Sequence, residues 1–163
     1  MKREQGFSLI ELLIVVAIIA IIAAIAVPSM LQARMAANEA GAIQGCRTIG
    51  SAEVAYSAIN NQSYADLATL ITAGNLDSRF TNGFNGYDYA TGATVTGATG
   101  SVTPPDGFGA SATPKSTSTA RYTYGIGADQ VVRYEGTNAT AMKCGLSDCN
   151  AGDPIGTTGG SGS

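Results

Sequence analysis

One acidic side chain, Glu11, stands near the start of an apolar stretch, where a carboxylate is unusual. From Leu12 to Val27 every side chain is apolar. An ionisable group inside a membrane-spanning helix costs roughly 2.5–3.5 kcal/mol at the helix centre, and it usually marks a functional position. A buried carboxylate without a partner costs several kcal/mol. A carboxylate at this position therefore calls for an explanation.

Composition limits the other chemistry that the chain can perform. The 163 residues include no histidine, which excludes a histidine triad, a histidine metal site and a histidine general base. The formal net charge is -3, so no basic surface argues for nucleic-acid binding. We find no phosphate-binding loop, nucleophile elbow or paired-carboxylate site. We therefore predict no catalytic residue, no cofactor and no enzymatic activity.

Three cysteines are present. Cys144 and Cys149 enclose the sequence CGLSDC and are close enough in the chain to bridge, whereas Cys46 is left over. A tight pair beside an exported segment suggests an oxidising compartment, so we expect a structural disulfide, with two free thiols as the alternative. Neither a CxxC spacing nor a nearby third ligand favours a redox or metal role. Cys46 lies in a predicted helix and is most simply a small core residue.

A weak calcium candidate follows the second cysteine of that pair. Asp148, Asn150 and Asp153 form a D-x-N-x-x-D pattern. The pattern lacks the glycine placement and the terminal Glu of a calcium loop, so a solvated turn is the preferred interpretation. We predict no other metal site.

The element that must position Glu11 is the apolar segment of residues 7–27. A helix of this length spans roughly 30 Å, the thickness of a bilayer's hydrocarbon core. Lys2 and Arg3 precede it and suit a cytoplasmic start. Two ordinary interpretations are a secretory signal peptide, cut after the AIA of residues 24–26, and a plain signal anchor. The apolar run is too long for the first, and both leave Glu11 unexplained.

A third interpretation explains the leader and the acid together, because the N-terminus resembles that of a bacterial type IV pilin or type II secretion pseudopilin. Members carry a short basic leader that ends in Gly, followed by Phe, with Glu as the fifth residue after the cut. Here these are Gly6, Phe7 and Glu11, within GFSLIELLIVVAIIAIIAAIAVPSM. Pro28 matches a proline that the family carries some way into the mature chain. The resemblance is strong only over residues 1 to about 30.

The resemblance implies a processing step and an assembly role. A prepilin peptidase would cut between Gly6 and Phe7 and would methylate the new amine on Phe7, while the apolar run stays with the mature chain. Gly6 suits cleavage because it has no side chain to obstruct the protease. Glu11 would pair with the amine of a neighbouring subunit during assembly, which supplies the positive partner that it needs.

Beyond the apolar run, the chain keeps helical spacing to about Asn60. We expect one helix that bends at Pro28, because proline removes a backbone hydrogen bond; the alternative is that Pro28 begins a separate helix. An apolar stripe on this helix is expected to pack on a sheet. The stripe comprises Leu31, Met35, Ala42, Cys46, Ile49 and Tyr56. Gly41, Gly45 and Gly50 weaken the helix by up to about 1 kcal/mol each, so packing must hold it.

A short second helix is predicted in SYADLATLITAGN. Ser63 and Asp66 form a capping-box-like pair at its start, and Gly74 supplies a stop at its end. Its apolar side chains, Leu67, Leu70 and Ile71, are expected to pack on the head.

The sheet is predicted from the later residues. Residues 81–120 are rich in Gly, Thr, Ser and Ala, and we expect mostly loop there, with one strand in GYDYAT. A hairpin is predicted with strands near 120–126 and 130–135, around a Gly-Ala-Asp turn. Tyr122 and Tyr124 would share one face of its first strand.

These elements predict the α+β class, with a long N-terminal membrane and stem helix packed on a small antiparallel sheet head, as in the type IV pilin fold. The expected divisions are the leader, 1–6; the transmembrane or filament-core half of the helix, 7–28; the stem helix, 29–60; a globular α+β head, 61–156; and a flexible tail, 157–163.

The function that the resemblance implies is that of a structural subunit. After processing, it would leave the inner membrane and polymerise with other copies into an extracellular type IV pilus. The prepilin peptidase and the pilus assembly machinery are the other expected partners. The alternatives are a type II secretion pseudopilin in a periplasmic pseudopilus and, from another class, a secreted soluble binding domain freed at Ala26.

Overall fold

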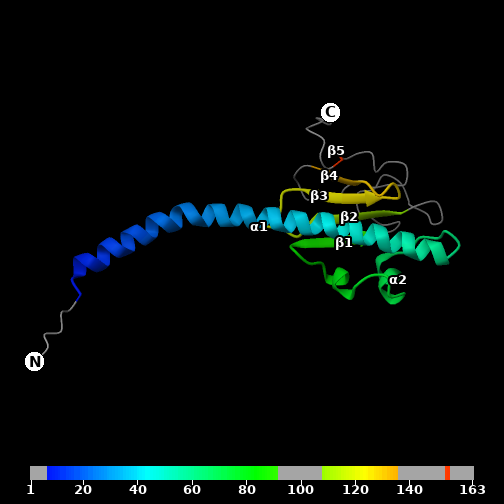
Figure 1. Cartoon of the computed structure of the whole chain (residues 1–163), viewed down its shortest axis with the longest axis horizontal. Coiled ribbons are helices and arrows are strands. Elements are labelled where there is room, and N and C mark those ends of the chain that lie inside the picture. Colours follow the sequence, from blue (N-terminus) through cyan, green and yellow to red (C-terminus); the bar gives the residue numbers. More distant parts are fainter. Residues whose placement is uncertain (1–6, 92–107, 136–152, 155–163) are drawn as a thin grey trace, which may run out of the picture. The chain divides into compact units, whose positions relative to one another are not determined.

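The computed structural model describes residues 7–91, 108–135 and 153–154, which belong to two compact units. The first unit ends at Arg34 and, in its described part, consists of the front of a long helix. The second unit begins at Met35 and contains the rest of that helix, a short helix and a small sheet (Figure 1).

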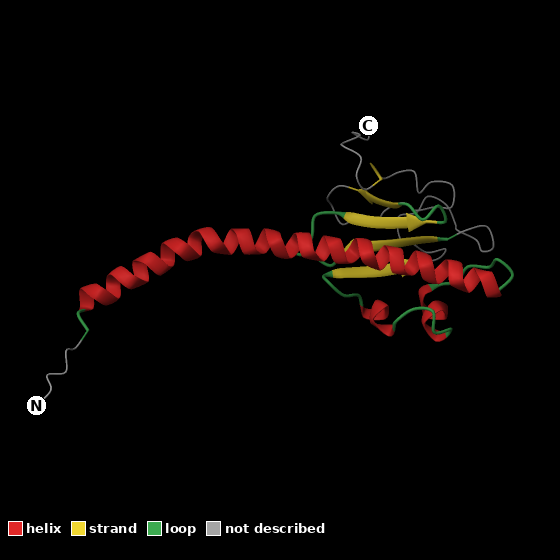
Figure 2. Cartoon of the chain, viewed as in Figure 1, coloured by secondary structure: helices red, strands yellow, loops and turns green. Residues whose placement is uncertain are grey.

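The long helix, α1 (Leu9–Ile59), has 51 residues and contains Pro28 (Figure 2). The prediction that one helix continues past Pro28 is confirmed, and the alternative of a separate helix beginning there is wrong. Proline lacks the N–H that would bond to the carbonyl of Ala24, so one hydrogen bond of the helix is missing at this point. A bend at Pro28 stays a prediction.

The sheet of the second unit is antiparallel throughout, and its strands follow one another in chain order. They are β1 (Tyr87–Thr91), β2 (Gly109–Pro114), β3 (Thr123–Gly127), β4 (Val132–Glu135) and β5 (Asp153–Pro154). A long helix on a small antiparallel sheet is the α+β arrangement that the sequence predicted, and this fold class is confirmed.

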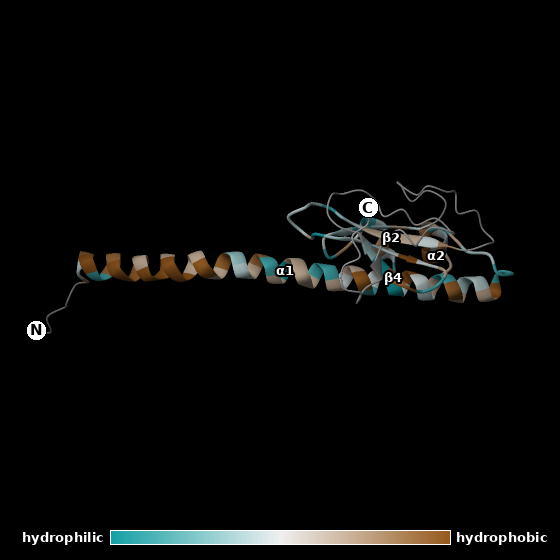
Figure 3. Cartoon of the chain, turned by 90° about the horizontal axis from the view of Figure 1, so that it is seen from above, coloured by the Kyte–Doolittle hydropathy of each residue, from teal (hydrophilic) through white to brown (hydrophobic). Residues whose placement is uncertain are grey.

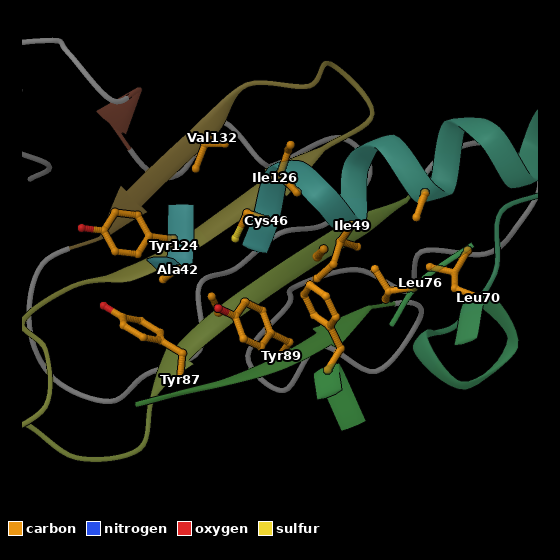
Figure 4. Packing of buried hydrophobic residues seen from close by; sticks show 14 of the residues in the cluster. Ala42, Cys46, Ile49, Leu70, Leu76, Tyr87, Tyr89, Tyr124, Ile126 and Val132 are labelled. Atoms are coloured by element: carbon orange, nitrogen blue, oxygen red, sulfur yellow. The ribbon is translucent and has the colours of Figure 1, made fainter. Parts of the chain in front are cut away.

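The part of α1 in the second unit covers one face of this sheet. Ala42, Cys46 and Ile49 are fully buried, and Figure 4 shows them over side chains of the strands. Those side chains alternate along each strand and include Tyr87, Tyr89, Ala110, Ala112, Tyr124, Ile126 and Val132. The predicted stripe is therefore correct at its centre. Met35 and Tyr56 are half-buried, whereas Leu31, in the first unit, is exposed.

Two helix glycines allow the sheet to approach closely. A Cβ atom on Gly45 would lie 2.5 Å from Cε1 and 2.6 Å from the hydroxyl oxygen of Tyr89. A Cβ atom on Gly50 would lie 2.6 Å from Oε1 of Gln130. These glycines weaken the helix locally, as expected, but they also make room for side chains of the sheet and of its β3–β4 turn.

The second helix is α2 (Leu67–Thr72). The predicted capping pair would have started it directly after Ser63, so the helix begins later than predicted. Asp66 itself is the N-cap, and its Oδ1 accepts a hydrogen bond from the backbone N of Thr69 at 2.8 Å. The pairing of Ser63 with Asp66 is therefore wrong. Gly74 follows the C-cap with a φ of +78°, so the predicted stop is confirmed. A 3-10 helix, η1 (Ser78–Asn82), comes next.

In its described part, residues 81–91 and 108–120, the region predicted to be mostly loop contains two strands rather than one. β1 confirms the strand in GYDYAT, but β2 was missed. Small residues with weak strand preference build β2, and it exists because β1 and β3 pair with it on both sides. The predicted hairpin is confirmed as β3 and β4, although β3 begins at Thr123 rather than near residue 120. Its turn closes with a hydrogen bond from the Gln130 N to the Gly127 carbonyl oxygen at 3.0 Å.

Candidate processing and assembly segment

Glu11 lies in the first turn of α1 and is the fifth residue after the predicted cleavage position. Phe7 precedes the helix and is 83% exposed. Glu11 Oε2 accepts a hydrogen bond from the backbone N of Ser8 at 3.0 Å, and the Ser8 carbonyl oxygen accepts one from the Leu12 N at 3.3 Å. The carboxylate thus lies among the unpaired N–H groups of a helix start, where the helix dipole favours negative charge.

This contact is one half of a capping box, in which an acid at the third helical position reaches back to the residue before the helix. A carboxylate offers about four acceptor positions, so the bond to Ser8 leaves Glu11 able to accept another partner. Ser8 was not predicted from the sequence as part of this site. The S-x-x-E pattern of Ser8 and Glu11 was the signal that would have found it.

The helix that follows Glu11 is hydrophobic along its length (Figure 3). It exposes large apolar side chains at successive positions, so no face of it is covered. They include Leu12, Leu13, Ile14, Val15, Val16, Ile18, Ile19, Ile21, Ile22, Ile25 and Val27. An 18-residue window has a mean hydropathy of 3.2 and none of it is buried, so the helix is long and apolar enough to cross a membrane.

This exposed apolar surface is far larger than a soluble monomer tolerates, because burial of one such side chain gains about 1.5–3 kcal/mol. The segment therefore needs an apolar surrounding. Lipid tails and the apolar helices of other copies can both supply one, and the same residues suit either setting.

Several of the predicted site residues lie outside the described residues. They are Gly6, Cys144, Asp148, Cys149 and Asn150. The first residue of the cleavage pair, the disulfide and two of the three calcium candidates consequently stay predictions. The third calcium candidate, Asp153, is a backbone partner of Tyr134 in the sheet.

Cys46 lies in the core between α1 and the sheet, as expected for a small apolar residue. It is fully buried and has no disulfide partner among the described residues, and burial raises the pKa of its thiol to about 12. The thiol is therefore protonated at neutral pH and unreactive. Within residues 7–91, 108–135 and 153–154, no cluster of three or more Cys, Asp or Glu side chains is arranged to hold a metal ion.

Comparison with known proteins identifies the N-terminal segment. Residues 1–27 match the family model of the prokaryotic N-terminal methylation motif. The match includes Gly6, Phe7 and Glu11, the three residues on which the resemblance was based. No curated protein and no solved structure matches the chain.

Proposed function

We propose that this chain, whose N-terminal segment is that of the type IV pilin and pseudopilin superfamily, is a structural subunit of an extracellular type IV pilus. The methylation motif indicates a substrate of the prepilin processing machinery and fits an inner-membrane precursor. The observation that carries the proposal is the combination of this motif with a fully exposed apolar helix. The proposed role is structural rather than catalytic.

In this proposal, the peptidase cuts between Gly6 and Phe7 and leaves a methylated amine on Phe7. The exposed apolar side chains of α1 then leave the lipid and pack against the same segments of other copies. Little apolar surface meets water at any stage, so the transfer avoids the large cost of exposing it.

Glu11 would select the packing register between copies. Its carboxylate accepts a hydrogen bond from Ser8 and retains capacity for the amine of a neighbouring subunit. An ion pair in an apolar surrounding is tolerable only when both charges are present. Packing that leaves Glu11 without the amine would therefore be disfavoured by several kcal/mol.

The motif is shared by type II secretion pseudopilins, so the experiment must separate a surface pilus from a periplasmic pseudopilus. Intact mass and N-terminal peptide mapping should be applied to material sheared from the cell surface and to the membrane fraction. Abundant sheared protein that begins at methylated Phe7 is the expected result. The same terminus found only in the membrane fraction would replace the pilus with a pseudopilus.

A chain that begins at Val27, or one that still carries Met1, would contradict processing at Gly6. The start at Val27 would instead favour a secreted soluble domain. The N-terminal residue and the fraction that contains it together separate the three functions, before any filament is observed.

Assembly is tested with Glu11→Leu. We expect this variant to insert into the membrane and to be processed, but to yield far fewer filaments, because its neighbour's amine loses its buried partner. Leu12→Ile, which keeps an apolar side chain at the adjacent position, is the control and should assemble normally. A normal filament yield from Glu11→Leu would contradict the proposed pairing.

A further inference from the structure

A second glutamate, Glu53, lies in the second unit and takes no part in the proposed function. It is on α1, and its side chain is fully buried. Oε2 accepts a hydrogen bond from the backbone N of Ala65 at 3.0 Å. Oε1 is buried and has no hydrogen-bond partner among the described residues. A buried polar atom without a partner is destabilising and calls for an explanation.

The hydrogen bond to Ala65 ties α1 to residues 60–73, which we call the α2 segment. This segment leaves α1 through Asn61 and Gln62, both in the left-handed region with φ of +51° and +62°. Such backbone is unusual for residues other than glycine, and it concentrates the change of direction in two residues. Glu53 and this turn are therefore two of the features that fix where the α2 segment lies on α1.

The packing of the α2 segment on the end of α1 is loose. Within α2 only Leu70 is fully buried. An open groove of about 510 Å³ lies between the two helices. It is lined by Tyr56, Ile59 and Asn60 on one side and by Ala68, Thr69, Thr72 and Ala73 on the other. A short helix with few buried side chains belongs to the part of a fold that opens locally at low cost.

Among the described residues, the charged and titratable groups near Glu53 offer no compensation for a negative charge. Tyr56 follows it by one turn on α1, and Tyr64 and Asp66 flank Ala65 in the α2 segment. Asp66 is the charged group among these, and its charge is negative. Within the described residues, Glu53 forms no ion pair with Lys or Arg. The carboxyl group is therefore easier to bury neutral than ionised.

We propose that Glu53 makes the attachment of the α2 segment pH-sensitive, so that the segment opens from α1 as rising pH ionises the buried carboxyl group. The neutral form is held in place at acidic pH, whereas the ionised form gains solvation when the segment opens. The device belongs to the second unit alone and does not depend on the proposed function.

The direction of the effect follows from the pKa of Glu53. Burial, opposed by the hydrogen bond from Ala65 and reinforced by Asp66, raises this pKa from 4.5 to about 7. The pKa of Glu53 is higher in the closed state than in the open state. The closed state is therefore fully stabilised when the pH is below the pKa of the open state. This stabilisation is lost as the pH rises through the pKa of the closed state. Linkage then predicts that the opening equilibrium constant increases roughly 70-fold between about pH 5 and about pH 8.

Hydrogen exchange of the full chain in detergent micelles tests this proposal. The amides of Ala65 and of Leu67–Thr72 are followed at pH 5 and pH 8, and each rate is divided by the intrinsic rate at that pH. Glu53→Gln is the matched variant, since its amide oxygen can accept the same hydrogen bond without a titrating charge. The amides of Thr123–Gly127 in β3 are an internal control for global unfolding.

We expect opening of the α2 segment to rise roughly 70-fold in the wild type and to stay constant in Glu53→Gln. The same pH dependence in both proteins, or none in the wild type, would overturn the proposal. Asp66→Asn provides a second test that keeps Glu53 in place. Removing the neighbouring negative charge should lower the pKa of Glu53 and shift the opening midpoint to lower pH, and an unchanged midpoint would count against the assigned electrostatics.

Discussion

The close approach of the sheet to α1 at Gly45 predicts opposite consequences for the same substitution at two helix positions. Alanine is up to about 1 kcal/mol more favourable than glycine inside a helix, so Gly41→Ala and Gly45→Ala gain similarly in helix propensity. They differ in what the new methyl group meets. At position 45 it would lie 2.5 Å from the ring of Tyr89, which is buried in the core.

At position 41 the methyl group would meet the terminal amide of Asn85, whose exposed side chain can turn away. Overpacking of a core costs typically about 1–3 kcal/mol. The gain in helix propensity is similar in both variants. Gly45→Ala should therefore be less stable than Gly41→Ala by about this cost of overpacking. Gly41→Ala itself should be equal to the wild type or slightly more stable.

Tyrosine near-UV circular dichroism is a suitable assay, because all seven tyrosines lie in the second unit and the chain has no tryptophan. Thermal unfolding of the detergent-solubilised chain should give a lower midpoint for Gly45→Ala than for Gly41→Ala, by about 2–4 °C per kcal/mol. Combining Gly45→Ala with Tyr89→Leu should cost less than the sum of the single changes. Equal midpoints for the two alanine variants would refute the steric argument.

Two further predictions concern local electrostatics. Asp66→Ala removes the N-cap bond to Thr69 and should lower the free energy of unfolding by about 1 kcal/mol, whereas Asp66→Asn should cost little; denaturant titration measures both. The Arg133 side chain holds the pKa of Asp129 below its ordinary value of 3.8, so the stability that Asp129 contributes is present above that value and lost as pH falls below it. Arg133→Gln should therefore be less stable at neutral pH and lose less stability on acidification below pH 3.8, and parallel acid curves would contradict this.

The N-terminal segment could be predicted from the sequence because its signal is local. Glu11 is conspicuous against sixteen apolar neighbours, and Gly6 and Phe7 stand at fixed distances from it. The long helix α1 could also be predicted, because the spacing of its apolar residues is visible within one stretch of the chain. Such features can be recognised in the sequence without knowing which residues pack against them.

β2 could not be predicted in this way. Gly109–Pro114 contains small residues that favour loops, and its strand conformation depends on β1 and β3 at its two edges. Its small side chains also suit the space beneath α1, where the rings of Tyr87, Tyr89 and Tyr124 fill the core around them. The information that makes β2 a strand lies in its neighbours, far along the chain.

The buried glutamates show a signal that was present and misjudged. The predicted stripe advances by seven residues from Met35 to Ala42 and again from Ile49 to Tyr56, and each gap leaves one helical turn of the buried face unaccounted for. Glu39 and Glu53 occupy those turns, four residues after Met35 and Ile49, and both are buried.

Helical periodicity therefore indicated that positions 39 and 53 face the core. Only the residue type, a charged glutamate, favoured a position on the surface. The two glutamates then differ in what the fold offers them. Glu39 Oε1 accepts from the backbone N and the guanidinium of Arg121, at 3.0 and 3.3 Å. Glu53 receives one backbone N–H and no cation from the described residues. A buried acid on the apolar face of a helix is thus a structural link when a cation pairs with it, and a titrating group when no cation does.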